Sequence, residues 1–144
     1  MKLSKLLLAP LLLSGLVLLI AQTPKAMSLE QRLRESRWQK RVLLIAASTA
    51  AQTDFKAQQV LLAAHQADLA ERDFLVLEVL YDQLSPADQQ FILQKTGVRP
   101  PGFAAILIGK DGGVKETSSR PIAPAALFGT VDKMPMRRQE MRKR

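Results

Sequence analysis

The sequence predicts one α/β domain with a four-stranded mixed sheet flanked by helices, and two patterns support this prediction. Short apolar runs, of the kind that form central strands covered on both faces, occur at residues 41–47, 74–80 and 103–108. A stretch of helical length separates the first two runs, which favours a right-handed parallel unit. Asp111-Gly112 follows the third run and is typical of a tight hairpin turn. A short antiparallel strand is therefore expected at residues 114–116.

A long helix is predicted between the first two runs. Asp54 is a suitable N-cap for it, because its side chain can accept from backbone N–H groups that the first turn leaves free. The apolar positions that would face the sheet recur every seven residues, at Phe55, Leu62 and Leu69. The pattern predicts one continuous helix that ends near Arg72.

Two further helices are predicted within the domain. Ser85 and Pro86 are typical of an N-cap and a first helical position, and Gly97 is the expected stop of that helix. The last helix is expected over residues 124–133, where apolar residues occupy one face. The order of elements is then strand, helix, strand, helix, two strands, helix.

A short helix is predicted ahead of the domain, in an N-terminal arm at residues 22–37. Ser28 and Gln31 have the spacing of a capping box. Apolar residues four positions apart give this helix a thin apolar stripe. We expect Trp38 to pack the arm against the body of the domain.

The first 21 residues have the pattern of an export signal. Lys2 and Lys5 precede an apolar stretch at residues 6–21, which is shorter than the roughly 20 residues that a membrane span needs. The sequence predicts a signal peptide at residues 1–21, with cleavage after Ala21 or Ala26. The alternative is an uncleaved membrane anchor. The chain is accordingly expected to be periplasmic or extracellular.

The charge is distributed unevenly. The chain has a net charge of +8, with twenty-one Lys and Arg, one His and no cysteine. Residues 42–136 contain eight bases and ten acids, so the body is mildly acidic and both ends are basic. A nucleic-acid binder is expected to have a basic face on its folded body, so this distribution argues against nucleic acid as a partner. The absence of cysteine excludes thiol chemistry and thiolate metal sites.

The predicted order of elements is that of a thioredoxin fold. Residues 97–114 resemble the second half of a thioredoxin, in which a cis-proline loop precedes a strand and a hairpin follows. Pro101 is displaced by about one position from that proline, and whether its peptide bond is cis is left open. The redox Cys-x-x-Cys would fall at residues 50–53, where both cysteine positions are lost.

The chain also resembles domain-of-unknown-function family 4174, a thioredoxin- and peroxiredoxin-like family shared by secreted bacterial proteins and vertebrate sushi-repeat matrix proteins. The resemblance extends from about Trp38 to Met141, and residues 134–141 are its most specific segment. It further rests on residues 40–44, 69–73, 102–103 and 108–115. The resemblance implies the fold, but it implies no activity and no catalytic residue.

A ligand-site hypothesis concerns the carboxyl end of the first strand and the Pro-rich loop before the third. Ligands favour this edge of open α/β sheets, and a helix N-terminus there offers free N–H groups. Capping by Asp54 is the alternative, because its carboxylate would occupy those donors. The residues of this hypothesis are Ser48, Thr49, Gln52, Thr53, Arg99 and Pro101.

The last ten residues, 135–144, form a basic tail with two interpretations. One is contact with an anionic envelope surface or an acidic protein, and the other is a frayed, solvated end. We expect the tail to contribute little to the core, so that its removal leaves folding intact. The bases of the tail are Arg137, Arg138, Arg142, Lys143 and Arg144.

The sequence thus predicts an exported, cysteine-free thioredoxin-like domain at residues 38–134. Its predicted role is a binding or structural module of the cell envelope. A cysteine-independent enzyme or redox accessory protein, using the loops at the carboxyl ends of the strands, is the alternative. No catalytic residue, cofactor or metal is predicted, because His65 is the only histidine and lies beside the buried stripe of its helix.

Overall fold

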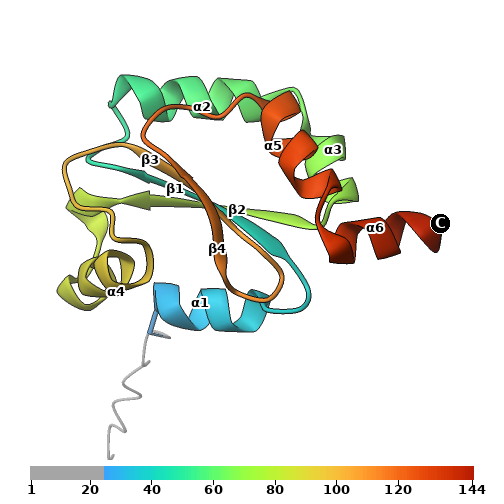
Figure 1. Ribbon diagram of the computed structural model, residues 1–144. Coiled ribbons are helices and arrows are strands. Elements are labelled where there is room, and N and C mark those ends of the chain that lie inside the picture. Colours follow the sequence, from blue (N-terminus) through green and yellow to red (C-terminus); the bar gives the residue numbers. More distant parts are fainter. Residues whose placement is uncertain (1–24) are drawn as a thin grey trace, which may run out of the picture.

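The computed structural model describes residues 25–144, so the predicted export signal lies outside the described residues. Four strands form one mixed sheet in the order β2-β1-β3-β4 (Figure 1). β1 and β2 are parallel, β3 is antiparallel to β1, and β4 is antiparallel to β3. The strands are β1 (Arg41–Ala47), β2 (Phe74–Leu80), β3 (Ala104–Ile108) and β4 (Val114–Ser118).

Helices cover both faces of this sheet (Figure 1). One face is covered by α2 (Thr53–Ala63), α3 (Gln66–Glu71) and α5 (Pro124–Asp132). The other is covered by α1 (Leu29–Ser36) and α4 (Pro86–Thr96). A 3-10 turn η1 (Tyr81–Gln83) follows β2, and α6 (Pro135–Arg142) follows α5 at the edge of the molecule. This topology is the thioredoxin fold, so the predicted fold class is confirmed.

Two hydrophobic cores lie on the two faces of the sheet, because successive side chains of a strand point to opposite sides. Leu43 and Ile45 of β1 enter the core beneath α2 and α5, whereas Val42 and Leu44 enter the core beneath α1 and α4. Every residue of β1 and of β3 is buried. The continuous apolar runs therefore predicted these two strands correctly.

The second strand was expected to be buried over residues 74–79, and this expectation is wrong in part. Leu77 and Val79 are buried, but Glu78 is exposed and residues 74–76 are half-buried. β2 pairs only with β1, so it lies at the edge of the sheet. An edge strand lacks a neighbour on one side, which leaves its side chains more accessible to solvent.

The long helix predicted from Asp54 to Arg72 is two helices. α2 ends at Ala63, and His65 has a non-helical backbone (φ −122°, ψ 28°) before α3 begins. The break turns the chain towards the sheet, so that Leu69 enters the same core as the apolar residues of α2. Asp54 lies inside the first turn of α2 and is not its N-cap, since Gln52 occupies that position.

The N-terminal arm packs on the domain, but Trp38 does not hold it there. Leu29 and Leu33 are buried in the core under α4, whereas Trp38 is 62% exposed. Ser28 caps α1 as predicted, with its hydroxyl accepting from the N–H of Gln31 at 3.2 Å. The Gln31 side chain bonds to Glu35 instead of completing the capping box.

Candidate functional site

The loops at the carboxyl ends of the strands bring part of the predicted ligand site together. The Ser48 hydroxyl donates to the carbonyl oxygen of Pro101, and the Pro100–Pro101 peptide is cis. The Ser48 N–H donates to the Gln52 side chain at 2.8 Å, and Thr49 Oγ1 accepts from the N–H of Ala51 at 3.2 Å. The polar groups of these loops thus bond largely to one another.

Two members of the predicted site take no part in these contacts. Thr53 and Arg99 are exposed, and within residues 25–144 neither forms a side-chain hydrogen bond with the other four. The region where a redox motif would lie, residues 50–53, contains two alanines, a glutamine and a threonine. The arrangement holds the turn between β1 and α2, and it contains no thiol.

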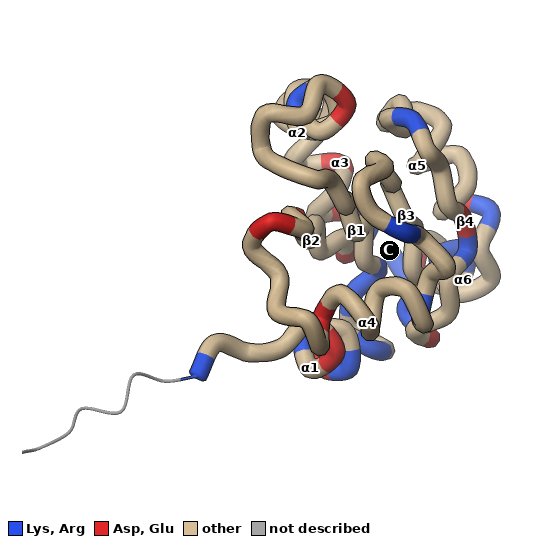
Figure 2. Tube along the Cα trace, turned by 90° about the vertical axis from the view of Figure 1, so that its left-hand side faces the viewer, with Lys and Arg blue, Asp and Glu red and all other residues tan. Residues whose placement is uncertain are grey.

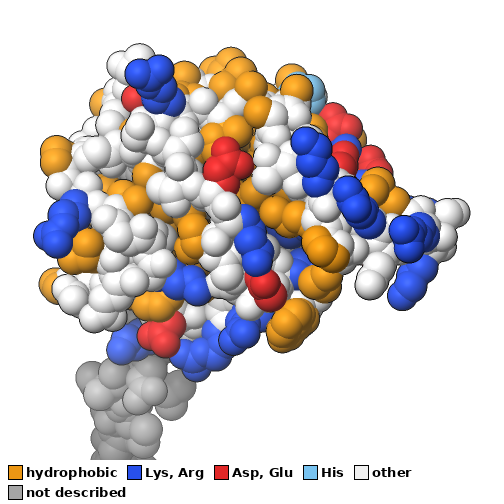
Figure 3. Space-filling model, in the orientation of Figure 1, with side chains coloured by type: hydrophobic (Ala, Val, Ile, Leu, Met, Phe, Trp, Pro, Cys, Tyr) orange, Lys and Arg blue, Asp and Glu red, His pale blue; other side chains and the backbone are white. Residues whose placement is uncertain are grey.

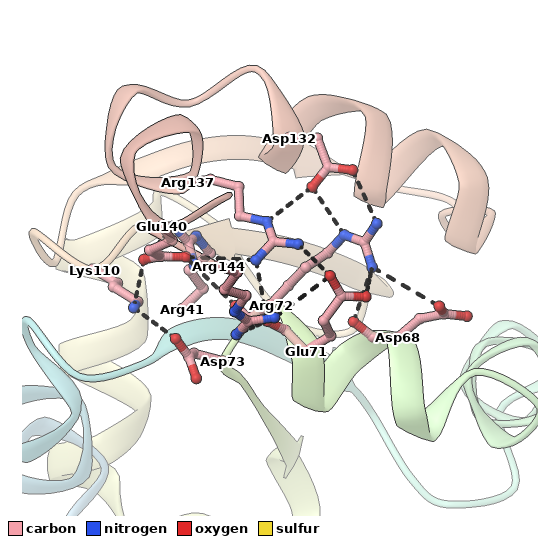
Figure 4. A network of polar contacts seen from close by, with 10 residues as sticks. All are labelled: Arg41, Asp68, Glu71, Arg72, Asp73, Lys110, Asp132, Arg137, Glu140 and Arg144. Carbon is pink, nitrogen blue, oxygen red and sulfur yellow. Dashed lines mark hydrogen bonds and ion pairs between the residues drawn. The ribbon is translucent and has the colours of Figure 1, made fainter. Parts of the chain in front are cut away.

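A larger polar assembly lies at the opposite end of the sheet, where β1 and β2 begin and β3 ends. Figure 4 shows ten charged side chains there, five basic and five acidic, and we call them the ion-pair network. They come from α3, α5, α6 and the ends of three strands. The ten residues are Arg41, Asp68, Glu71, Arg72, Asp73, Lys110, Asp132, Arg137, Glu140 and Arg144.

Glu140 of α6 is the centre of one half of this network. The two terminal nitrogens of Arg41 each donate to it at 3.2 Å, and Lys110 Nζ donates to it at 2.7 Å. Lys110 also bonds to Asp73 at 2.8 Å, and Arg41 donates to the carbonyl of Arg72 at 2.9 Å. The Arg41 side chain is only 1% exposed and that of Lys110 is 9% exposed, so both cations depend on these partners.

Arg137 of α6 is the centre of the other half. Its side chain is 1% exposed and bonds to Glu71 at 2.8 Å and to Asp132 at 3.2 Å. Asp132 also receives two hydrogen bonds from Arg72, at 3.0 and 2.9 Å. The Arg72 guanidinium lies 4.4 Å from the ring centroid of Phe128, which links the network to the core beneath α5.

Three acids of the network, Asp73, Asp132 and Glu140, have a lowered pKa, which favours their ionised form. Burial alone raises the pKa of Glu140, but hydrogen bonds and charges from Lys110 and Arg41 outweigh it, so the pKa lies below its ordinary value. Burial also raises the pKa of Asp73, but the hydrogen bond and the charge of Lys110 outweigh it, so this pKa too lies below its ordinary value. For Asp132, the hydrogen bond from Arg72 is the main cause of a lowered pKa. Acids of this kind are poor proton donors at neutral pH.

The network corrects the interpretation of the tail as a frayed end. Residues 135–142 form α6, and Arg137 is buried instead of exposed to a partner. Arg137, Glu140 and Arg144 recur at helical spacing and face the body, and Arg144 lies 3.6 Å from Glu71. Arg138, Arg142 and Lys143 remain exposed.

One sequence signal for α6 was overlooked. Pro135 stands at the first helical position, and Glu140 lies between Arg137 and Arg144 at spacings of three and four residues. This pattern favours a helix with a charged stripe. Nothing local, however, indicates that the stripe is buried, because its partners belong to other elements.

Two further properties concern residues 25–144 alone. No group of three or more acidic or histidine side chains in this range is placed to hold a metal ion. None of its helices combines the length and the apolar character needed to cross a membrane.

Fold and site together define a class of protein: a thioredoxin-fold domain without cysteine, whose C-terminal helix is fixed by ion pairs to the start of the sheet. More particularly, the chain belongs to the family described as "Domain of unknown function (DUF4174)", which matches residues 32–140. The segments on which the resemblance to this family rests supply Arg41, the Glu71 to Asp73 stretch, Lys110 and Glu140. Four of these segments, residues 40–44, 69–73, 108–115 and 134–141, therefore meet at the ion-pair network.

The chain is also similar to proteins of known name or structure. It is 28% identical over 141 residues to the zebrafish (Danio rerio) coiled-coil domain-containing protein 80, covering 81% of this chain but only 16% of that protein. Among solved structures, it matches a modified Prx1a of Plasmodium yoelii with 13% identity and a TM-score of 0.49, over 74% of this chain and 80% of that one. Thioredoxin peroxidase I of the same organism matches with 15% identity and a TM-score of 0.47, over 77% and 78%.

Proposed function

We propose that the protein is an exported, non-redox binding module of the cell envelope, which attaches to an anionic surface through exposed bases. The observation that carries this proposal is the charge left outside the ion-pair network. Lys2 and Lys5 account for two of the eight net positive charges, so residues 25–144 have a net charge of +6. The network contains equal numbers of bases and acids, so the excess lies outside it.

The excess positive charge is concentrated at one side of the molecule. Figure 2 shows several Lys and Arg along α1 and α6, whereas the base on α2 has an acid beside it. On α6, the exposed bases Arg138, Arg142 and Lys143 make no ion pair within residues 25–144. Each base near an anionic surface contributes about 1 kcal/mol, so these three together favour attachment by about 3 kcal/mol.

The alternative, a cysteine-independent enzyme that uses the loops at the carboxyl ends of the strands, has less support. Catalysis there would need a polar group that is free to act on a substrate. Instead, Ser48 bonds to Pro101, and Gln52 accepts from the backbone of Ser48. Ser48 and Gln52 stabilise the turn, and Thr53 and Arg99 do not join them in one arrangement, so we assign no reaction to these loops.

Attachment is tested by co-sedimentation of the full chain with vesicles that contain phosphatidylglycerol, at low and moderate salt. Vesicles of phosphatidylcholine alone measure any binding by residues 1–24, and this background is subtracted. Combined replacement of Arg138, Arg142 and Lys143 by glutamine is expected to weaken the charge-dependent binding about 100-fold, as three charges at about 1 kcal/mol each require.

A matched control removes three exposed bases elsewhere, with Lys56, Arg99 and Arg120 replaced by glutamine. This variant has the same net charge as the α6 variant but keeps the bases of α6, so it is expected to bind nearly as well as the wild-type chain. Equal weakening in both variants would mean that only net charge matters. Absence of any binding that depends on phosphatidylglycerol would refute the proposed function.

A further inference from the structure

We propose that the anionic surface is a phospholipid bilayer and that Trp38 is the residue that inserts at its interface. This inference rests on the proposed function and names the partner of the same basic side of the molecule. It starts from Trp38, the only tryptophan of the chain, which is 62% exposed at the junction between α1 and β1.

The backbone of Trp38 is unusual for so large a residue. Its φ is 65°, in the left-handed region, and it follows the C-cap of α1, where glycine is the favoured residue. The conformation is fixed because the Trp38 N–H donates to the carbonyl of Lys110 at 2.6 Å. A bulky side chain in this conformation, with most of its surface in solvent, is not explained by packing.

Two basic residues lie close to Trp38 in the chain, and one of them contacts its ring. The Arg37 guanidinium lies 5.8 Å from the centroid of the indole ring, and Lys40 is exposed two residues further along the chain. Arg37 also rests on the hairpin tip, where its Nε is only 3.0 Å from the position that a Cβ on Gly112 would take. A tryptophan beside lysine and arginine is the combination that proteins present to the interface of an anionic membrane.

An exposed methionine of α6 adds apolar surface to the basic helix, and it favours a bilayer over a purely polar polyanion. Met136 is 38% exposed. Together with Lys110 it lines a cavity of about 310 Å³. Lys110 is also the residue whose carbonyl accepts the hydrogen bond from the Trp38 N–H. Figure 3 shows basic and hydrophobic side chains side by side on this part of the surface. Exposed apolar groups gain from contact with acyl chains, whereas a polar polymer offers them nothing.

The single tryptophan makes the test direct, because the indole emission of the full chain reports only the environment of residue 38. With vesicles that contain phosphatidylglycerol, we expect a blue shift of the emission and quenching by brominated acyl chains. With phosphatidylcholine alone, both effects are expected to be absent. Arg37→Gln is expected to reduce the quenching several-fold, while the matched control Arg120→Gln leaves it unchanged.

Trp38→Gly separates membrane contact from folding. Since glycine suits the left-handed region, this variant is expected to unfold at the same or higher urea concentration, as measured by circular dichroism, yet to co-sediment several-fold less with the anionic vesicles. Trp38→Phe is expected to bind between the two. A clear loss of stability in Trp38→Gly would overturn the inference, because Trp38 would then have a structural role.

The failures of the two proposals are distinguishable. If the wild-type chain shows no binding that depends on phosphatidylglycerol, the proposed function itself fails. If binding depends on the bases of α6 but the Trp38 emission is neither shifted nor quenched, only the bilayer inference fails. The same blue shift with soluble polyglutamate, which has no acyl chains, would also overturn the inference in favour of a polyanion.

Discussion

Replacement of Glu140 by glutamine tests whether the ion-pair network fixes α6 to the domain. The substitution nearly preserves the shape of the side chain but removes its negative charge. Glu140 accepts two hydrogen bonds from Arg41 and one from Lys110, and both cations are almost inaccessible to solvent. In the variant, the buried cations Arg41 and Lys110 therefore lose the carboxylate that they share.

The expected loss of stability follows from the burial of these partners. Removing one member of a fully buried ion pair costs about 3–5 kcal/mol. The Glu140 side chain, however, is 22% exposed. Each cation also retains a second partner, because Lys110 still bonds to Asp73 and Arg41 still bonds to the carbonyl of Arg72. We therefore expect Glu140→Gln to lower the free energy of unfolding by about 2–3 kcal/mol.

Urea denaturation at neutral pH, followed by circular dichroism, measures this change. The urea concentration at the midpoint of unfolding is expected to fall, while the slope of the unfolding free energy against urea concentration stays the same. Glu35→Gln is the matched control, because Glu35 is an exposed acid on α1, and a change within about 0.5 kcal/mol is expected for it. A similarly small change for Glu140→Gln would refute the reasoning. Deletion of residues 135–144 is expected to destabilise the domain at least as much, since it also removes Arg137.

Three further predictions concern Gln58, Tyr81 and the acids of the ion-pair network. Gln58→Leu is expected to destabilise the fold by about 2–4 kcal/mol in urea denaturation, because Gln58 is fully buried and bonds to both the N–H and the carbonyl of Ile122, at 2.8 and 3.1 Å. Tyr81→Phe is expected to stabilise it by about 1 kcal/mol, because the buried Tyr81 hydroxyl has no hydrogen-bond partner within residues 25–144. A loss of stability in this variant would contradict the prediction. Acid is expected to weaken the domain. The folded pKa values of Asp73, Asp132 and Glu140 lie below their ordinary values, so the stability that these carboxylates contribute is present above the ordinary values and is lost as the pH falls through the folded values, which unfolding curves at decreasing pH will show.

Several elements were predictable from the sequence because their signals are local. Ser85 caps α4 by accepting from the N–H of Asp88, and Gly97 ends the helix at φ 72°. The hairpin after β3 turns at Gly112, with φ 82°, as the Asp-Gly pair indicates. Each of these signals depends on atoms within four residues of one another, so all the interacting residues are neighbours in the sequence.

The charged residues give no such local signal, because their partners lie far away in the sequence. Arg41 and Glu140 are 99 positions apart in the chain, yet they share two hydrogen bonds. Sequence alone predicts a basic segment near Arg41 and a basic tail near Arg137, and the structure buries both side chains among acids. The candidate surface for anionic contact therefore changes from all five bases of the tail to Arg138, Arg142 and Lys143, which lie outside the ion-pair network.

The sequence by itself determined the order of elements along the chain, the hairpin, the caps of α1 and α4 and the absence of thiol chemistry. Only the tertiary structure decided that β2 lies at the edge of the sheet, that the long helix breaks at His65, that α6 docks, and that Trp38 is exposed. The physical reason is the range of the interactions. Backbone propensity and capping act within a turn, whereas the cost of burying a charge depends on partners that come together only when the chain has folded.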